Sequence, residues 1–488
     1  MANIIGRQEE SAILQRLFNS SKPEFLAIYG RRRVGKTYLI RQFFRDKELV
    51  FFNVTGSKEG SKKEQLTHFV EQIGNVFYGG VTLSVPTQWD AAFKLLTTAM
   101  EQVSKSKKII LFFDEIPWMA TPKSRLLQNL DYYWNQHWSN DERIKLIICG
   151  SSASWIIKNV INNRGGLHNR LTERLRLEPF TLLETQQFLE STGITLNRSQ
   201  ILLIYMAMGG IPYYLTHIEK GLSAIQNIEK LAFREKGLLF NEFDHLFSSL
   251  FDPADEHIEM IKLIGSRQYG IGQRELLKGL KKSMMGSGGY KKLKELEETG
   301  FIMSFMPYQH QRQGIYYRLV DQYSLFYLRW IAPIRKTLQK RTMQSGNFER
   351  MQQTPEWNGW LGYAFESICY AHIPLIQKKL AISAGAIADS WRYVPRKNTV
   401  ERGAQIDLLF DRMDDAVTLC EIKYSTTPFV LTKDYVEVLQ RKMQVFKEKT
   451  GTKKQLFLAM ITTEGLKNNF YAEGLINGVV VLDDFFNA

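Results

Sequence analysis

Hydrophobic residues in the first third of the 488-residue chain form short apolar runs separated by helix-period segments. The segments Glu24–Tyr29, Ile109–Phe113 and Ile144–Ser152 have the near-continuous apolar character of strands buried in a parallel sheet. Thr37–Phe44 follows the first run and predicts a helix. The pattern therefore predicts an α/β fold, in which ligands bind beyond the carboxyl ends of the strands.

The pattern changes after Pro212, where the sequence is helical to about Phe251 and then divides into shorter elements. Three short helical segments precede a segment that alternates like a hairpin: 257–265, 272–280, 288–302 and 303–321. Three helices and a wing describe a winged-helix domain. Its recognition helix would carry three basic residues near its start: Lys291, Lys292 and Lys294. These residues could contact phosphates, or the domain could serve only as a packing extension of a lid.

Two further strand candidates lie in the last third of the chain, at 403–412 and 416–425. Asp407 lies in the first of them, and Glu421 and Lys423 lie in the second. Because residues two apart in a strand face the same side, Glu421 and Lys423 are expected to point together. An exposed, salt-bridged strand pair would explain the same residues without any chemistry.

Composition and charge indicate a folded protein with several domains and a preference for an anionic partner. Hydrophobic residues make up 44% of the chain and charged residues 23%, as in folded proteins, and the length predicts about two to four domains. The formal charge of +14 favours an anionic partner, most often nucleic acid, although a merely basic soluble protein would have the same charge.

The expected compartment follows from the cysteines and from the N-terminal sequence. Cys149, Cys369 and Cys420 lie far apart without metal-type spacing, which fits a reduced compartment. The first residues lack a signal-peptide pattern, and no apolar run is long enough to cross a bilayer. We therefore expect a cytoplasmic protein with no membrane association.

The segment Gly30–Thr37 satisfies G-x-x-x-x-G-K-[ST], the phosphate-binding P-loop pattern. It lies between a predicted strand and a predicted helix, which is the required context. Its glycines let backbone N–H groups face phosphate oxygens, and the helix N-terminus adds its dipole. Lys36 would reach the β- and γ-phosphates of ATP, and Thr37 would hold Mg²⁺. The residues predicted to contact nucleotide here are Gly30, Arg31, Arg32, Arg33, Val34, Gly35, Lys36, Thr37 and Tyr38.

Polar residues follow the other two predicted strands. Asp114 and Glu115 come directly after the second strand, where Asp114 would hold the metal and Glu115 would activate the attacking water. Ser151 follows the third strand and is expected to sense the γ-phosphate, although it could be an ordinary turn serine.

Two arginines are candidates for delivery to the γ-phosphate of a neighbouring subunit. Arg170 and Arg174 lie four residues apart, on one face if this segment is helical, and Arg176 follows in an extended segment. A surface or structural role is the alternative for both residues.

Four stretches in combination resemble the archaeal-type ATPase branch of the AAA+ superfamily: the upstream IIGRQEESAILQRL, then FFDEIPWM, CGSSASWI and MGGIPYYL. The resemblance covers about residues 3–215. It implies a nucleotide domain with a helical lid, and a homo-oligomer, with a hexamer as one option. It also implies that Gly6 and Arg7 lie near the adenine. The Gly-Gly-x-Pro segment that ends at Pro212 would connect the lid either to the nucleotide or to the core domain.

The pairing of Asp407 with Glu421-x-Lys423 resembles the PD-(D/E)xK nuclease core, over about residues 357–482. The resemblance implies that Asp407 and Glu421 bind Mg²⁺ or Mn²⁺, that Lys423 orients water or neutralises charge, and that Glu366 is the helical acid. The usual proline is absent, since Ile406 precedes Asp407. A later basic helix offers three residues for a nucleic-acid backbone: Gln440, Arg441 and Lys442.

We therefore predict a multi-domain α/β protein that is a Mg²⁺-dependent ATPase acting on DNA. The predicted domains are an AAA+ P-loop core at 1–185, a helical lid at 186–251, a winged helix at 252–322 and a restriction-endonuclease-like α/β domain at 323–488. Two other functions fit the same sequence. One is a switch-type signalling ATPase whose last domain binds a partner, and the other is a DNA motor with a non-cleaving clamp.

Overall fold

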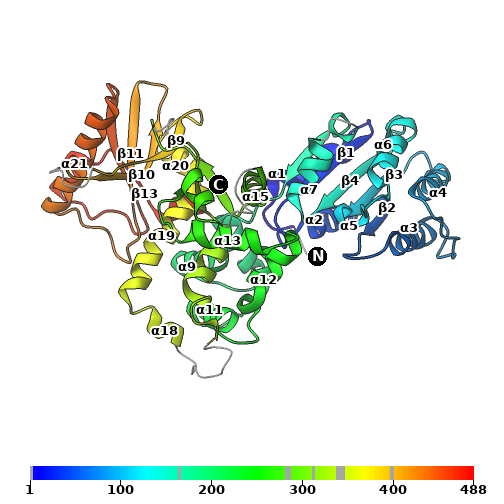
Figure 1. Cartoon of the computed structure of the whole chain (residues 1–488), viewed down its shortest axis with the longest axis horizontal. Coiled ribbons are helices and arrows are strands. Elements are labelled where there is room, and N and C mark those ends of the chain that lie inside the picture. The colour runs from blue at the N-terminus through cyan, green and yellow to red at the C-terminus, as the bar shows by residue number, and fades with distance from the viewer. Residues whose placement is uncertain are drawn as a thin grey trace. The chain divides into compact units, whose positions relative to one another are not determined.

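The computed structural model describes residues 4–162, 166–280, 287–309, 314–336, 347–395 and 401–487. The chain divides into two compact units. The first comprises Met1–Pro179 with Ser249–Asp252, and the second comprises Phe180–Ser248 with Pro253–Ala488. Each unit is described by itself below, and Figure 1 identifies their elements.

A five-stranded parallel sheet organises the first unit, with the strand order β2-β3-β4-β1-β5. Its strands are β1 (Glu24–Tyr29), β2 (Leu49–Thr55), β3 (Lys108–Asp114), β4 (Ile144–Gly150) and β5 (Glu173–Arg176). Every residue of β4 is buried, as the continuous apolar run predicts. The strands predicted at Glu24–Tyr29, Ile109–Phe113 and Ile144–Ser152 are thereby confirmed.

Helices connect these strands and cover the sheet (Figure 1). They are α1 (Gln8–Asn19), α2 (Lys36–Phe44), α3 (Lys62–Phe77), α4 (Trp89–Glu101), α5 (Ile116–Met119), α6 (Leu126–Gln136) and α7 (Ala153–Ile156), with single turns at Trp138–Asn140, Ile157–Ile161 and Leu167–Asn169. Aromatic rings fill the core between α3, α4 and the sheet. Phe69 of α3 contacts Phe52, Trp89, Phe93 and Phe113. This packing fixes the sheet whose carboxyl edge carries the P-loop.

The possible helical relation between Arg170 and Arg174 is wrong. Arg170 directly follows the short turn Leu167–Asn169, whereas Arg174 lies in β5. The reason is strand pairing, because Glu173–Arg176 aligns in parallel with β1 as the edge of the sheet. The extended conformation predicted at Arg176 is confirmed.

The second unit begins with helices α8 (Leu182–Ser191), α9 (Arg198–Met208), α10 (Pro212–Leu215), α11 (Ala224–Ala232) and α12 (Leu238–Leu250). A three-helix segment follows: α13 (Asp255–Gly265), α14 (Gln273–Lys278) and α15 (Ser287–Glu298). Its antiparallel sheet has the order β6-β8-β7, with β6 (Ile271–Gly272), β7 (Ile302–Phe305) and β8 (Tyr316–Leu319). Three helices and a small hairpin sheet are thus present where the sequence predicts them.

A mixed five-stranded sheet with the order β13-β12-β11-β10-β9 forms the C-terminal part of the second unit. Its strands are β9 (Ile387–Tyr393), β10 (Ala404–Asp411), β11 (Ala416–Lys423), β12 (Gln455–Thr462) and β13 (Gly478–Val480). The accompanying helical segments are α16 (Gln322–Phe326), a π-turn (Tyr327–Ile331), α18 (Asn347–Met351), α19 (Pro355–Ala371), α20 (Ile373–Lys379), α21 (Lys433–Thr450), α22 (Phe470–Leu475) and a final short turn (Leu482–Phe486). The protein is therefore a multi-domain α/β protein with a parallel-sheet core and a separate mixed-sheet domain.

The pairing of β10 with β9 is irregular between Ile406 and Leu409. Three residue steps on β10 match two steps on β9 there, so β10 carries a bulge at Asp407 and Leu408. A bulge redirects the side chains beside it, which bears on the position of Asp407. Among the residues that the structure describes, no helix is long and apolar enough to cross a membrane.

Candidate functional site

The loop that joins β1 to α2 depends on its two glycines. Gly30 has φ of 141°, and a Cβ added there would lie 2.3 Å from the carbonyl oxygen of Leu177. Gly35 has φ of 93° in the left-handed region and directly precedes α2. Only glycine takes both conformations without strain. The loop therefore curls back and places the N-terminus of α2 at the end of the sheet.

Lys36 begins α2 and lies in the concave side of this loop. Its Nζ donates hydrogen bonds to the carbonyl oxygens of Gly30 and Arg31, each at 2.9 Å. Burial lowers the pKa of Lys36, while the carboxylates of Glu115 and Asp114 act in the opposite direction. A buried ammonium group held by carbonyl oxygens is a site that an anion would stabilise.

Thr37 and Asp114 meet across the carboxyl edge of the sheet. The Thr37 hydroxyl donates to Oδ2 of Asp114 at 2.8 Å, and Oδ1 of Asp114 accepts the backbone N–H of Glu115 at 3.1 Å. These oxygens come from the first turn of α2 and the end of β3. Mg²⁺ prefers such hard oxygen ligands, so the two residues fit the metal role predicted for them.

Glu115 and Ser151 form a second contact at the same edge. Oε2 of Glu115 accepts both the backbone N–H and the hydroxyl of Ser151, at 3.0 and 2.9 Å. Glu115 has φ of 50°, an uncommon conformation for this residue type. Burial raises its pKa, although the bonds from Ser151 oppose the shift. A carboxylate with a raised pKa is better matched to accepting a proton from water near neutral pH.

The remaining residues predicted to contact nucleotide occupy different parts of the fold. Arg31 and Val34 are buried in the loop, Arg32 and Arg33 are half-buried, and Tyr38 is exposed. Gly6 has positive φ, and Arg7 donates through Nη2 to the carbonyl oxygen of Val34 at 3.2 Å. Pro212 begins α10 in the second compact unit. Arg7 thus contacts the P-loop directly, and its position near the adenine remains a prediction.

Arg170 and Arg174 are both exposed in the first unit. Nε of Arg170 lies 4.0 Å from Oδ1 of Asp131, a long ion pair that would leave the guanidinium available. Delivery to a neighbouring subunit remains a prediction for both arginines.

The geometry of this edge fits a nucleotide with Mg²⁺. The cradle has a buried lysine, two hard-oxygen donors from Thr37 and Asp114, and a carboxylate for water. A Cβ added at Gly35 would meet no atom within 4 Å, so there is open space beside the loop. The whole arrangement comes from one sheet edge within one compact unit.

A second group of charged residues lies on the C-terminal sheet around Glu421, which is 3% exposed. Oε1 accepts the Tyr435 hydroxyl at 2.6 Å and lies 3.1 Å from Nζ of Lys423, while Oε2 accepts Nζ of Lys442 at 2.6 Å. Burial opposes ionisation, but the two lysines hold the pKa of Glu421 below its ordinary value. Glu421 and Lys423 thus face the same side of β11, as predicted.

Asp407 and Glu366 belong to the same group. Oδ2 of Asp407 accepts the backbone N–H of Ile422 at 3.1 Å, and burial beside Glu421 raises the pKa of Asp407. Burial and the neighbouring Asp407 raise the pKa of Glu366 to about 8. Placing two such acids next to each other costs free energy, and a bound proton or cation lowers that cost. The structure therefore brings Glu366, Asp407, Glu421 and Lys423 into one carboxylate cluster.

This carboxylate cluster does not form a three-ligand cage. Within the described ranges, no three His, Cys, Asp or Glu side chains are arranged to hold a metal ion. The physical reason is visible at Glu421, where Tyr435, Lys423 and Lys442 already occupy both oxygens. Asp407 and Glu366, whose raised pKa values favour a counter-charge, fit a divalent cation better than Glu421 does.

Two residues of this region, Tyr435 and Arg318, were not singled out from sequence, and a third, Lys442, was predicted only to contact a nucleic-acid backbone. Lys442 pairs with Glu421, and its contact with a nucleic acid remains a prediction. A signal for Tyr435 and for the pairing of Lys442 existed, because positions seven apart in a helix share a face and both residues belong to α21. Arg318 comes from β8, and only the tertiary fold brings it near Glu366.

The lysines of the predicted recognition helix α15 are all paired with acids. Lys291 lies 3.6 Å from Glu295, Lys294 lies 3.7 Å from Glu298, and Lys292 lies 2.7 Å from Glu256 of α13. Lys291 and Lys294 remain well exposed despite these contacts, whereas Lys292 is half-buried. Exposed pairs of this kind are weak, so phosphate could replace their acid partners. The role of these lysines remains a prediction.

We expect Glu115→Gln to retain ATP binding while lowering turnover about 100-fold or more, because glutamine keeps a carbonyl acceptor for Ser151 but cannot accept a proton. ATP binding and steady-state hydrolysis should be measured on the same preparation. Glu101→Gln, at an exposed position on α4, is a matched control. Loss of binding rather than turnover would identify Glu115 as a metal ligand or a structural residue.

Sequence comparison identifies relatives in one archaeon. Over 427 residues the chain is 26% identical to the uncharacterized protein MJECL04 of Methanocaldococcus jannaschii, covering 86% of this chain and 87% of that protein. A segment of 45 residues is 44% identical to the uncharacterized ATP-binding protein MJ0423 of the same organism, covering 9% of this chain and 76% of that protein.

Structural comparison finds partial similarities. A Walker-type ATPase of Pyrococcus abyssi has 17% identity and a TM-score of 0.47, over 67% of this chain and 96% of that one. The ORC2 protein of Aeropyrum pernix has 14% identity and a TM-score of 0.46, over 70% and 96%. Residues 5–218 match the family described as an ATPase domain predominantly from Archaea. Over residues 5–218, the N-terminal part of the chain thus resembles this family of archaeal-type ATPase domains.

Proposed function

We propose that this ATPase acts on DNA, with ATP binding and hydrolysis controlling a C-terminal metal-dependent nuclease domain. The winged helix over 252–322 and the nuclease-like domain over 323–488 are part of the proposal. One observation carries it. Asp407, Glu421 and Lys423 project from neighbouring strands into one buried group, with Glu366 of α19 beside them.

The carboxylate cluster is costly for stability alone. Glu366 and Asp407 lie in a buried environment that raises the pKa of both carboxyl groups, and Arg318, Lys423 and Lys442 only partly oppose this shift. A divalent cation held by Asp407 and Glu366 would polarise the scissile phosphate and assist ionisation of water. Lys423 would stabilise the charge that develops on the phosphate, and Tyr435 and Lys442 would fix the position of Glu421.

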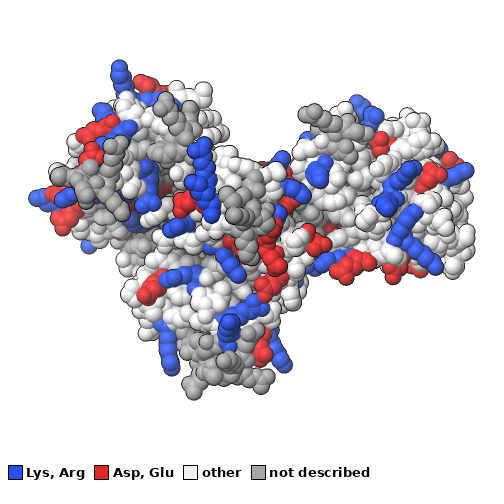
Figure 2. All heavy atoms as spheres, viewed as in Figure 1, with Lys and Arg blue, Asp and Glu red and all other residues white. Residues whose placement is uncertain are grey.

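Charge supports DNA as the partner. The formal charge is +14, and Figure 2 shows Lys and Arg side chains spread over the visible face with acidic residues among them. On α21, the exposed residues Lys433, Gln440 and Lys447 recur every seven positions, so they share one helix face. Such a face can follow a phosphate backbone, with binding that weakens steeply as salt increases.

The direct test is incubation of the full chain with linear duplex, single-stranded and branched DNA. Each substrate should be tested with and without ATP, in Mg²⁺ and in Mn²⁺. The proposal expects cleavage that needs a divalent cation and that changes with nucleotide. An absence of cleavage under every condition would contradict the nuclease, while the ATPase assignment would stand.

A second candidate is a DNA motor or clamp whose last domain binds without cutting. The observation that favours it is the saturation of Glu421 by Lys423, Lys442 and Tyr435. A retained fold with an internally neutralised glutamate would need no metal. DNA-stimulated ATP hydrolysis without cleavage would support this candidate.

We further propose a homo-oligomer in which Arg170 or Arg174 completes the ATP site of a neighbouring subunit. One of the variants Arg170→Ala and Arg174→Ala should lower hydrolysis about 1,000-fold while ATP affinity is retained, because an arginine finger acts on transition-state charge. Arg45→Ala, at the exposed end of α2, is the control.

Mixing the inactive arginine variant with Glu115→Gln tests whether the site is shared. Partial recovery of hydrolysis is expected, because a mixed interface can combine an intact Glu115 with an intact arginine. A monomeric protein with no recovery would contradict the shared site and favour the switch-type signalling ATPase.

A further inference from the structure

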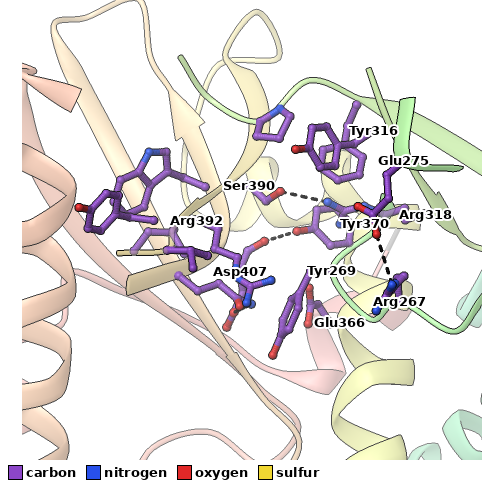
Figure 3. Close-up of a pocket in the computed structure, with 18 residues that line it drawn as sticks. Arg267, Tyr269, Glu275, Tyr316, Arg318, Glu366, Tyr370, Ser390, Arg392 and Asp407 are labelled. Carbon is purple, nitrogen blue, oxygen red and sulfur yellow. Dashed lines mark hydrogen bonds and ion pairs between the residues drawn. The ribbon is translucent and has the colours of Figure 1, made fainter. Parts of the chain in front are cut away.

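A cavity of about 570 Å³ opens beside the carboxylate cluster, between the β6–β8 sheet and the C-terminal sheet. Glu366 and Asp407 lie in its wall, together with Arg318 of β8 and Arg392 of β9 (Figure 3). Its volume falls in the range of about 300–1,000 Å³ that is typical of small-ligand sites. The cavity therefore lies next to the acids to which the proposed cleavage is assigned. Its volume is large enough for one small ligand, such as a single unit of a polymer.

Arg318 supplies a positive charge that also acts on Glu366 and Asp389, and one of its hydrogen-bond donors is unused. Its side chain is 7% exposed, and its guanidinium lies between the rings of Phe305 and Tyr370, with centroids 4.0 and 3.7 Å away. Nη2 donates to Oγ of Ser390 at 3.0 Å, whereas the buried Nε has no hydrogen-bond partner within the described part of the chain. No carboxylate among the described residues lies within 4.0 Å of it.

A buried cation with an unused donor is unfavourable unless an anion completes it. The two flanking rings hold the guanidinium plane in position, so a ligand would not have to order this side chain. Arginine in such a fixed plane is well suited to phosphate oxygens. Arg318 is thus suited to hold a phosphate group in the cavity.

Aromatic residues provide the second half of the site. Tyr269 is 45% exposed at the cavity, and the guanidinium of Arg392 lies 4.7 Å from the centroid of its ring. Trp391 also lines the cavity. Flat aromatic and guanidinium groups are surfaces on which unpaired nucleobases stack without regard to sequence. Figure 3 shows Tyr269 projecting close to Asp407 and Glu366.

We propose that this cavity binds one unpaired nucleotide of a DNA strand, with its phosphate on Arg318 and its base against Tyr269 and Arg392. This inference rests on the proposed function and names its substrate class. A base within a duplex is stacked and paired, so it must leave the helix before it can enter a cavity of this size. The substrate is therefore single-stranded DNA or a frayed strand end rather than continuous duplex.

Binding of the full chain should be measured by fluorescence anisotropy in EDTA, at one salt concentration. The two probes are a labelled single strand of about 12 nucleotides, which exceeds the site of many small binding domains, and a labelled, relaxed, covalently closed duplex circle, which has neither ends nor hairpin loops. We expect the single strand to bind at least about 10-fold more tightly. Tyr269→Ala and Arg392→Ala should each weaken single-strand binding about 10-fold, the size expected for one lost stacking contact.

Tyr471→Ala is the matched control, because Tyr471 is also partly exposed but lies on α22 outside the cavity. Arg318→Lys retains the charge and should weaken binding, while thermal melting reports whether it folds. Equal affinity for both probes, no binding to either, or equal losses in Tyr269→Ala and Tyr471→Ala would each overturn the inference.

The failure of the cavity inference can be distinguished from failure of the nuclease, because EDTA binding needs no cleavage. Selective single-strand binding that Tyr269→Ala removes, in a protein that never cuts, would keep the cavity and reject the nuclease. Metal-dependent cutting of the closed duplex circle at an unchanged rate in Tyr269→Ala would keep the nuclease and reject the cavity.

Discussion

Lys36→Ala is expected to lower ATP turnover by at least about 100-fold and to weaken nucleotide binding. Nζ of Lys36 is buried and is held by the carbonyl oxygens of Gly30 and Arg31, in the concave side of the loop. Phosphates bound in that loop would be stabilised by the positive charge of Lys36, in a buried site that holds little water. Loss of a single positioned donor in such a site costs about 100- to 1,000-fold in rate.

Nucleotide binding by calorimetry and steady-state hydrolysis together measure this effect. Lys94→Ala is a matched control, because Lys94 is exposed on α4 of the same compact unit. Thermal melting should show that Lys36→Ala remains folded, since alanine is well tolerated at the first turn of α2. Unchanged turnover in folded Lys36→Ala would place the hydrolytic site elsewhere.

The contrast between the two sites explains how far sequence could predict them. Residues 30–37 are contiguous, and the conformations of Gly30 and Gly35 follow from their identity, so the pattern alone predicts the loop. The positions of Asp114 and Glu115 at the carboxyl end of β3 could also be predicted, because parallel strands present their carboxyl ends at one edge of the sheet. The sequence could not predict that Glu115 accepts hydrogen bonds from Ser151, since that depends on the left-handed conformation of Glu115.

The C-terminal site was only partly predictable because it is assembled from distant elements. The two-residue spacing of Glu421 and Lys423 on a strand was sufficient to predict their common face. The bulge in β10 that positions Asp407 has no local glycine or proline to indicate it. Arg318 was missed because its position beside Glu366 results from packing of the β6–β8 sheet. Strand pairing also overrode the four-residue spacing of Arg170 and Arg174.

Asp407→Asn is expected to remove Mg²⁺- or Mn²⁺-dependent DNA cleavage, by about 100-fold or more, while ATP hydrolysis is retained. Asparagine keeps a side-chain oxygen for the backbone N–H of Ile422, so the bulge in β10 should persist. It removes the negative charge that, with Glu366, would attract the cation. Asp411→Asn is a matched control on the same strand, where Asp411 pairs with Lys454 at 2.7 Å.

Glu421→Gln extends this test to the other acid. Glutamine can still accept the Tyr435 hydroxyl, but Lys442 and Lys423 would lose their anionic partner inside a buried site. We expect cleavage to fall as in Asp407→Asn, together with a lower melting temperature, because two partly buried cations are left without their anionic partner. Isothermal titration with Mn²⁺ distinguishes the two acids. Asp407→Asn should abolish metal binding, whereas Glu421→Gln should retain part of it, since the Asp407–Glu366 pair remains. Cleavage by Asp407→Asn at the wild-type rate would show that the active site lies elsewhere in the chain.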